Sequence, residues 1–261
     1  MEADDRCTGT PVLRDVSDGV GWITLNRPQH MNAVTVGLAS ELEAAIREIG
    51  ADPAVNVVVI RGAGGNFCAG GDFDEVERLR SEGPEALRAL FTTFRRACDA
   101  IAAVEVPVLA AVEGVAMAGG FELMQAADIV LVSEAARIAD SHINFGMVPG
   151  GGSTQRLPRL VGRQLALGLL LSGDRLTGAD ATRLGLAYRS FAPGEFDSGV
   201  KKFAATLAAR QRAAVTTIKR LVYSSLSASQ AAGLDDEIAA VVEHVSGAAG
   251  ADGVAAFGAR R

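Results

Sequence analysis

The sequence is poor in cysteine and histidine. Its 261 residues hold three cysteines, Cys7, Cys68 and Cys98, none of which forms a C-x-x-C pair. An odd and sparse set of cysteines argues against a disulfide framework and is typical of a reducing compartment, so we expect a cytoplasmic protein. The three histidines lie far apart in the chain, which argues against a dedicated metal site.

The chain also lacks segments that would cross a membrane. No run of about eighteen uncharged apolar residues occurs, which argues against a membrane-spanning helix. The opening residues, MEADDRCTGT, are acidic and lack the apolar stretch of a signal peptide. The net charge of −6 argues against a general nucleic-acid-binding protein, although a local basic cluster would still suffice for an anionic small ligand.

Apolar residues, in contrast, make up 49% of the chain, which is enough to bury a large core in one α/β domain. We expect residues 1–10 to form a disordered lead-in and residues 11–195 to form the α/β core. Residues 196–261 are expected to be a helical region of the same domain that ends in a flexible tail of glycine and alanine.

Short apolar strands alternate with helical segments through the core. We expect strands at 12–16, 20–25, 55–60, 106–112, 129–132 and 187–191, and helices at 36–49, 84–103 and 120–127. Gly50 is expected to end the first of these helices, and Asp72 to cap a further one. Glycine-rich loops follow two of the strands. This alternation predicts a parallel sheet with a ligand site at the carboxyl ends of its strands.

The second of these loops, around Gly119 and Gly120, stands at the start of a predicted helix. Glycines there leave backbone N–H groups uncovered, where they favour an oxygen that carries negative charge. Glu122 follows within apolar sequence, and Asp140 and His142 come about twenty residues later. Oxyanion donors beside a candidate base are what enolate chemistry needs. A solvated glutamate at a helix start and a loop histidine bonded to the backbone are the alternatives that carry no function.

Other common motifs are missing or incomplete. Residues 62–65 (GAGG) follow a strand, but the next helix begins too late for a dinucleotide fingerprint. Residues 149–154 (PGGGST) lack the lysine of a phosphate-binding loop, and no G-x-S-x-G elbow of a serine hydrolase occurs.

Five short sequence pieces occur along the chain in a characteristic order. They are LNRP at 25–28 with Asn32 and Ala33, FCAGGD at 67–72, VEGVAMAGGFE at 112–122, PGGGSTQR at 149–156, and LSGDRLTGADA at 171–181 running into Gly185 and Leu186. Each piece alone is common, but the set in this order and spacing is specific, and it resembles the crotonase (enoyl-CoA hydratase/isomerase) superfamily. The resemblance covers residues 12 to 258. It implies a spiral of ββα units with a helical C-terminal extension, in trimers or dimers of trimers that act on acyl-CoA thioesters.

The same resemblance implies roles for individual residues. It places an oxyanion hole on the backbone N–H groups of Gly71 and Gly119. It places contacts to coenzyme A and substrate on Arg27, Ala33, Ala69, Gly70, Gly71, Asp72 and Phe73. Several members carry a lysine near the CoA phosphates at the position of Asp74, so the phosphate contact is expected from Arg27 or Lys219 instead. No separate cofactor is expected, because coenzyme A enters as part of the substrate.

Hydratases of the family use two glutamates to hold and split one water molecule. The first matches Glu122, whereas the second falls on His142, which exchanges protons near neutral pH. Asp140 is expected to orient the imidazole or to act as the acid itself. We therefore expect hydration of a 2-enoyl-CoA. Isomerisation of a 3-enoyl-CoA, hydrolysis of a thioester or of a carbon–carbon bond through His142, and a non-catalytic acyl-CoA-binding subunit are the alternatives.

Overall fold

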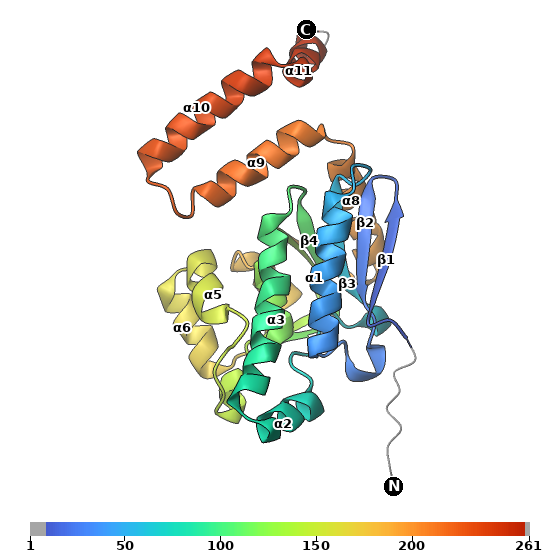
Figure 1. Cartoon of the computed structure of the whole chain (residues 1–261), viewed down its shortest axis with the longest axis vertical. Coiled ribbons are helices and arrows are strands. Elements are labelled where there is room, and N and C mark those ends of the chain that lie inside the picture. Colours follow the sequence, from blue (N-terminus) through green and yellow to red (C-terminus); the bar gives the residue numbers. More distant parts are fainter. Residues whose placement is uncertain (1–8, 259–261) are drawn as a thin grey trace.

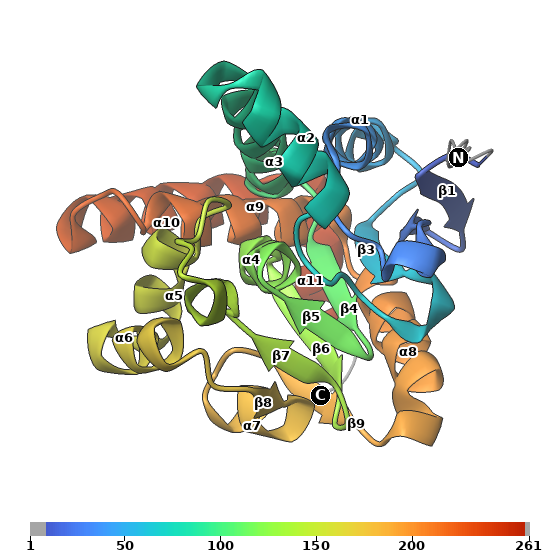
Figure 2. The same cartoon turned by 90° about the horizontal axis from the view of Figure 1, so that it is seen from below.

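A computed structural model of the protein describes residues 9–258, and for positions 252 and 254–257 it describes the backbone alone. Six strands form the main sheet, in the order β1-β2-β3-β4-β6-β9 (Figures 1 and 2). The first two strands pair antiparallel, and every later neighbour pairs parallel. The strands are β1 (Val12–Ser17), β2 (Val20–Leu25), β3 (Val57–Gly62), β4 (Val108–Val112), β6 (Ile129–Ser133) and β9 (Arg189–Phe191).

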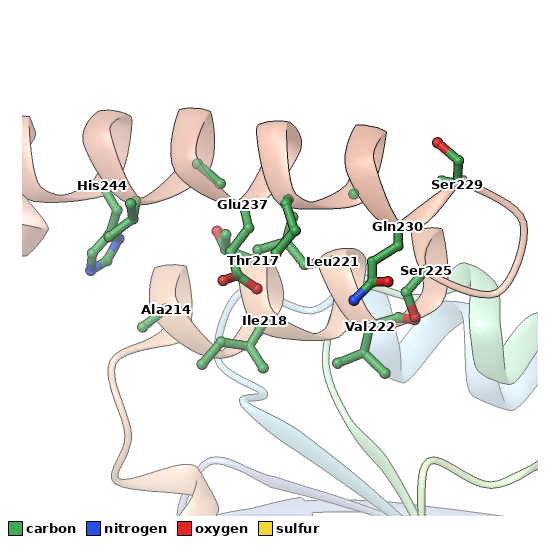
Figure 3. A pocket seen from close by; sticks show the side chains of 15 residues that line it. Ala214, Thr217, Ile218, Leu221, Val222, Ser225, Ser229, Gln230, Glu237 and His244 are labelled. Carbon is green, nitrogen blue, oxygen red and sulfur yellow. The ribbon is translucent and has the colours of Figure 1, made fainter.

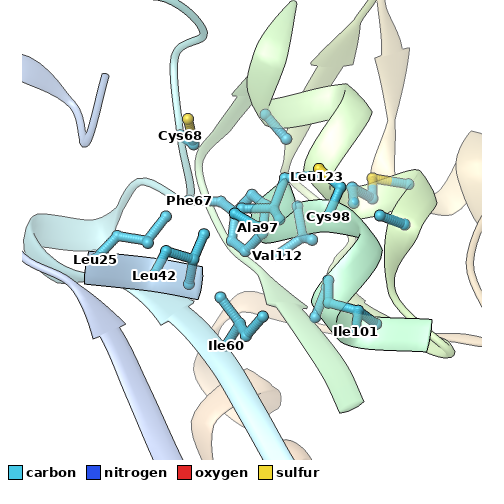
Figure 4. Packing of buried hydrophobic residues seen from close by; sticks show 14 of the residues in the cluster. Leu25, Leu42, Ile60, Phe67, Cys68, Ala97, Cys98, Ile101, Val112 and Leu123 are labelled. Atoms are coloured by element: carbon cyan, nitrogen blue, oxygen red, sulfur yellow. The ribbon is translucent and has the colours of Figure 1, made fainter. Parts of the chain in front are cut away.

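Both faces of the central strands are buried, which explains their unbroken apolar sequence. On one face, Ile60 of β3 and Val112 of β4 pack against Leu42 of α1 (Val36–Ala51) and Ile101 of α3 (Pro84–Ala103) (Figure 4). On the other face, neighbouring strand residues such as Val59 pack against the apolar side of α8 (Phe196–Ala208). The sheet is therefore a middle layer between helices.

A second, smaller sheet carries the loop that the sequence singles out. Its strands are β5 (Val115–Met117), β7 (Arg137–Ala139) and β8 (Leu176–Thr177), in that order. Helix α4 (Gly119–Ala126) begins two residues after β5, and all of its residues are buried. Helix α2 (Phe73–Glu82) is capped by Asp72, whose side chain accepts a bond from the Glu75 N–H, as predicted.

The remaining short elements connect these layers. They are η1 (Pro28–His30), η2 (Ala63–Gly65), η3 (His142–Phe145), α5 (Ser153–Val161), α6 (Arg163–Ser172), α7 (Gly178–Arg183) and η4 (Pro193–Glu195). Helices α9 (Arg212–Ser224) and α10 (Gln230–Ser246) then form a hairpin that projects from the body (Figure 1), and α11 (Ala248–Gly258) follows.

Two expectations were wrong at helix ends. Gly50 does not end α1, which runs on to Ala51; a Cβ at Gly50 would lie 2.7 Å from the Val104 side chain, so the glycine permits close packing instead. Residues 248–258 are a helix rather than a flexible tail, because their alanines favour helix over coil. The expected disordered lead-in falls almost wholly on residues 1–8, which lie outside the described residues. Within the described chain, no helix is long and apolar enough to cross a membrane.

Candidate active site

Strand-like pairing joins the two glycine-rich loops. The Cys68 N–H donates to the carbonyl of Val115 at 2.9 Å, and the Met117 N–H donates to the carbonyl of Cys68 at 3.0 Å. Residues 67 and 68 thus pair with β5 along its edge. The chain segments that follow, Gly70–Gly71 and Ala118–Gly119, are brought side by side by this pairing.

The backbone at this meeting point is held in uncommon conformations. Gly70 has a φ of +110°, and a Cβ there would lie 2.8 Å from the Cβ of Ala118. Ala118 itself has a φ of 47°, a strained value for a residue with a side chain. Within the described residues, the N–H groups of Gly71 and Gly119 have no hydrogen-bond acceptor. Both glycines line the same cavity, so two adjacent donors stand ready for one oxygen.

Glu122 lies on the first turn of α4 and is 2% exposed. Its Oε1 accepts bonds from the N–H groups of Gly151, at 2.7 Å, and Ser153, at 3.1 Å, so the carboxylate lies at the N-terminus of α5. Burial raises the pKa of Glu122, and it outweighs the lowering by these N–H donors and by the charge of His142. The raised pKa suits a group that exchanges a proton during catalysis.

His142 opens the 3-10 turn η3, and its Nδ1 lies 2.7 Å from Oδ1 of Asp140. Burial lowers the pKa of His142, but the hydrogen bond and charge of Asp140, together with the charge of Glu122, raise it above its ordinary value. Asp140 is 1% exposed. The predicted orienting role of Asp140 therefore has a geometric basis, and the carboxylate favours the imidazolium form of His142.

These groups surround one cavity of about 500 Å³. Of the residues predicted from sequence, Ala69, Gly71, Phe73, Gly119, Glu122 and His142 line it. The remaining wall is mainly apolar and comes mostly from α2, α3 and the η3 segment. Its apolar members are Val34, which precedes α1, and Val76, Leu90, Phe91, Phe94, Ala118, Phe145, Met147 and Val148, and its polar members are Glu77, Arg80 and Ser141.

Four residues that the resemblance assigns to ligand binding do not line the cavity: Arg27, Ala33, Gly70 and Asp72. They lie within the glycine-rich loop that carries Gly71 or behind it. Arg27 is 8% exposed, and its Nη1 donates to the carbonyl of Ala33 at 2.7 Å and to Asp72 at 2.9 Å. The Val34 N–H donates to the carbonyl of Gly70. These contacts hold the loop in place, and a contact of Arg27 with coenzyme A stays a prediction.

The suggested phosphate contact of Lys219 is wrong. Its Nζ is buried and donates to the carbonyls of Ile101 and Val106 and to Asp128, at 2.7, 3.0 and 2.7 Å. An ammonium group has three donors, and all three are used inside the protein. Lys219 therefore anchors α9 to the core.

The sequence did not predict how Glu122 is held. Besides the N–H groups of Gly151 and Ser153, Arg156 takes part, because its Nη1 donates to the Gly151 carbonyl at 2.6 Å. A Cβ at Gly151 would lie 2.6 Å from Glu122 Oε2, so this position needs glycine. The PGGGST motif at residues 149–154, followed by Arg156, was the sequence signal that could have indicated this arrangement.

A larger cavity, of about 790 Å³, lies between α9 and α10 (Figure 3). Its lining includes one carboxylate, Glu237, and one imidazole, His244, which are seven residues and hence about 10 Å apart along α10. The described lining of this cavity holds a single glycine, Gly233, whose N–H donates to the carbonyl of Ser229, so it has no counterpart of the donor pair at Gly71 and Gly119. Among the described residues, no group of three or more histidine, cysteine or acidic side chains is arranged to hold a metal ion.

Comparison with known proteins identifies the family. The sequence model of the enoyl-CoA hydratase/isomerase family matches residues 15–261. A probable enoyl-CoA hydratase of Rhizobium meliloti is 34% identical over 250 residues, which cover 96% of this chain and 95% of that protein. A peroxisomal Delta(3,5)-Delta(2,4)-dienoyl-CoA isomerase of Arabidopsis thaliana is 31% identical over 234 residues, which cover 86% of this chain and 84% of that protein.

Among solved structures, an enoyl-CoA hydratase from Polaromonas sp. JS666 superposes with a TM-score of 0.92 at 30% identity, over 96% of this chain and 97% of that one. One from Mycobacterium smegmatis gives 0.89 at 31% identity, again over 96% and 97%. The expected fold class is thereby confirmed. The chain belongs to the enoyl-CoA hydratase/isomerase family of the crotonase superfamily.

Proposed function

We propose that the protein adds water across the double bond of a 2-enoyl-CoA thioester. The observation that carries this proposal is the meeting of Glu122 and the His142–Asp140 pair at one cavity with the free N–H groups of Gly71 and Gly119. Asp140 raises the pKa of His142 and so favours its protonated form. The N–H groups of Gly151 and Ser153 stabilise the charged form of Glu122, and burial still leaves the pKa of Glu122 raised overall. One acid and one base are what hydration needs.

In the proposed reaction, the thioester carbonyl oxygen lies between the N–H groups of Gly71 and Gly119. Glu122 takes a proton from water as the water oxygen bonds to the β-carbon. The electrons of the double bond form an enolate, whose charge the two N–H groups stabilise, and the Nε2–H of His142 gives its proton to the α-carbon. A proton then returns from Glu122 to His142 through solvent. A single oxyanion donor typically contributes about 10²–10³ in rate.

The alternatives use fewer of these features. Isomerisation of a 3-enoyl-CoA needs only one base, Glu122, and the similarity to a dienoyl-CoA isomerase of Arabidopsis thaliana supports this alternative. It leaves the His142–Asp140 pair without a role, however. Hydrolysis through His142 needs the neutral imidazole as base, whereas Asp140 favours the charged form. A subunit that only binds acyl-CoA would need neither side chain.

A panel of 2-enoyl- and 3-enoyl-CoA esters of short and medium length tests the proposal. Mass spectrometry after chromatography follows gain of water, migration of the double bond and release of free coenzyme A. Gain of water at an enzymatic rate is the expected result. Migration without gain of water would assign the protein as an isomerase, and free coenzyme A would assign it as a hydrolase.

The proposed chemistry requires no separate cofactor. We also propose a homotrimer or a dimer of trimers in the cytoplasm. Both described cysteines, Cys68 and Cys98, are free and buried, which is consistent with a reducing compartment. Ile218, Val222 and Ile238 on α9 and α10 are each at least 60% exposed, an apolar surface that suits an interface between copies. Sedimentation equilibrium measures the size of the assembly.

A further inference from the structure

Phe91, on α3, lies between two cavities. One is the active-site cavity of about 500 Å³. The other is a groove of about 380 Å³ lined by α3 residues, among them Leu87 and Arg95, and by Gly150 of the glycine-rich loop. Of the described residues, Phe91 is the one that lines both. The side chain of Phe91 therefore borders both spaces.

The ring of Phe91 is held against the backbone of Gly150. A Cβ at Gly150 would lie 2.6 and 2.7 Å from two ring carbons, so the ring occupies the space that a side chain there would need. Phe91 is 42% exposed, whereas Phe94, one turn later on the same helix, is 4% exposed and belongs to the core. Phe91 therefore lies outside the buried core, where its ring packs on Gly150 and borders the cavity.

The groove beyond Phe91 suits a hydrocarbon chain. Leu87 and Pro84 present apolar side chains to it. Arg88 and Arg95 also line it, but their guanidinium groups lie 3.3 and 3.2 Å from Glu85 and Asp99. Such pairing keeps the charged ends at the solvent side and leaves the alkyl stems to cover an apolar ligand.

We propose that Phe91 sets the upper length of the acyl chain that the active site accepts. This inference rests on the proposed function to the extent that the ligand is an acyl-CoA. The chain fills the active-site cavity up to the ring, and removal of the ring joins the cavity to the groove. Longer chains then gain a place to be buried.

Binding of saturated, straight-chain acyl-CoA esters, from butanoyl to hexadecanoyl, tests this by isothermal titration calorimetry. Each buried methylene strengthens binding about four-fold, so affinity should rise with length and then level off where the chain meets Phe91. In Phe91→Ala the levelling point should move to longer chains, and in Phe91→Trp it should move to shorter ones. An unchanged levelling point in both variants overturns the proposal.

Phe145→Ala is the matched control, because Phe145 lines the active-site cavity but not the groove. If the levelling point in Phe145→Ala moves to longer chains by the same amount as in Phe91→Ala, a wider active-site cavity explains the effect. That result would also overturn the role of Phe91 as a partition between the two cavities. Saturated esters have no double bond to hydrate or to shift, so binding is measured apart from the proposed reaction. Binding without gain of water from enoyl esters would refute hydration and leave the role of Phe91 standing, whereas no binding by any ester refutes both.

Discussion

Nδ1 of His142 lies 2.7 Å from Oδ1 of Asp140, and the other oxygen of that carboxylate, Oδ2, is buried with no hydrogen-bond partner in the described part of the chain. The backbone N–H of His142 adds a longer bond, 3.4 Å, to the same Oδ1. Within the described residues, His142 is therefore the only hydrogen-bond partner of the Asp140 carboxylate. A carboxylate in this position fixes the proton of the ring on Nδ1 and leaves Nε2 for the substrate.

The pH dependence of kcat/KM should be bell-shaped. The pKa of His142 is raised, so the imidazolium is present below that pKa and is lost as pH rises through it. The pKa of Glu122 is also raised, so the carboxylate is lost as pH falls through it, above the usual range of a glutamate. Initial rates of hydration across pH measure both limbs. A rate that keeps rising at alkaline pH would contradict the role of His142 as acid.

Asp140→Asn should shift the alkaline limb of that profile to lower pH. The amide keeps the size of the side chain but removes the charge that raises the pKa of His142. At a pH above both values, the rate should fall about ten-fold for each unit by which the pKa of His142 decreases, because the protonated fraction falls in that proportion. A lower rate with an unmoved alkaline limb would mean that Asp140 acts only on the position of the ring.

Glu122→Gln should lower kcat by about 10²–10⁴, because the amide cannot take a proton from water. Acyl-CoA affinity should stay within a few-fold, since Gln has the same length and its oxygen still accepts from the Gly151 N–H. Turnover and calorimetric binding are measured on the same preparation. Full activity in this variant would exclude Glu122 as the base, and the absence of activity in the wild type would leave a binding subunit.

Gly151→Ala should disable the site while the fold persists. The added Cβ meets Oε2 of Glu122 at 2.6 Å and contacts the ring of Phe94, so one of them must move. Overpacking of this kind costs about 1–3 kcal/mol of stability. Gly168→Ala in α6 is the control, because its Cβ meets nothing within 4 Å. Urea unfolding and kcat are compared, and equal effects of the two substitutions would contradict the close packing at Gly151.

The order of the main elements was predictable because their sequence patterns are strong. The β-branched run before Gly62 and the apolar periodicity of residues 84–103 each indicate one structure, and α3 has the predicted bounds. Strands β5, β7 and β8 have two or three residues each, too few for any periodicity to show. The smaller sheet could not be predicted for that reason.

The parts of the site that lie within one sequence motif were predictable, whereas the contacts between residues of distant motifs were not. Glu122, Gly71 and Gly119 line the cavity as expected. Glu122 is held by Gly151 and Ser153, which lie 29 and 31 residues further along the chain. The PGGGST motif marks that segment as unusual, but the motif does not reveal which residue it contacts. Lys219 reads as an exposed basic residue of a helix, yet its bonds span more than a hundred residues, so only the folded chain reveals that it is buried.

Lys219→Met should lower the free energy of unfolding by about 3–5 kcal/mol, because it removes the cation beside Asp128, whose side chain is only 11% exposed. Asp128 then keeps the Tyr223 hydroxyl, at 2.6 Å, and the Val108 N–H as donors, which do not neutralise it. Lys201→Met is the matched control: Lys201 also forms an ion pair at 2.7 Å, with Asp197, but both side chains are more than half exposed, so its loss should cost at most about 1 kcal/mol. Urea unfolding measures both values. Similar losses in the two variants would mean that Asp128 gains solvent once Lys219 is gone, and that α9 is anchored to the core by its apolar contacts instead.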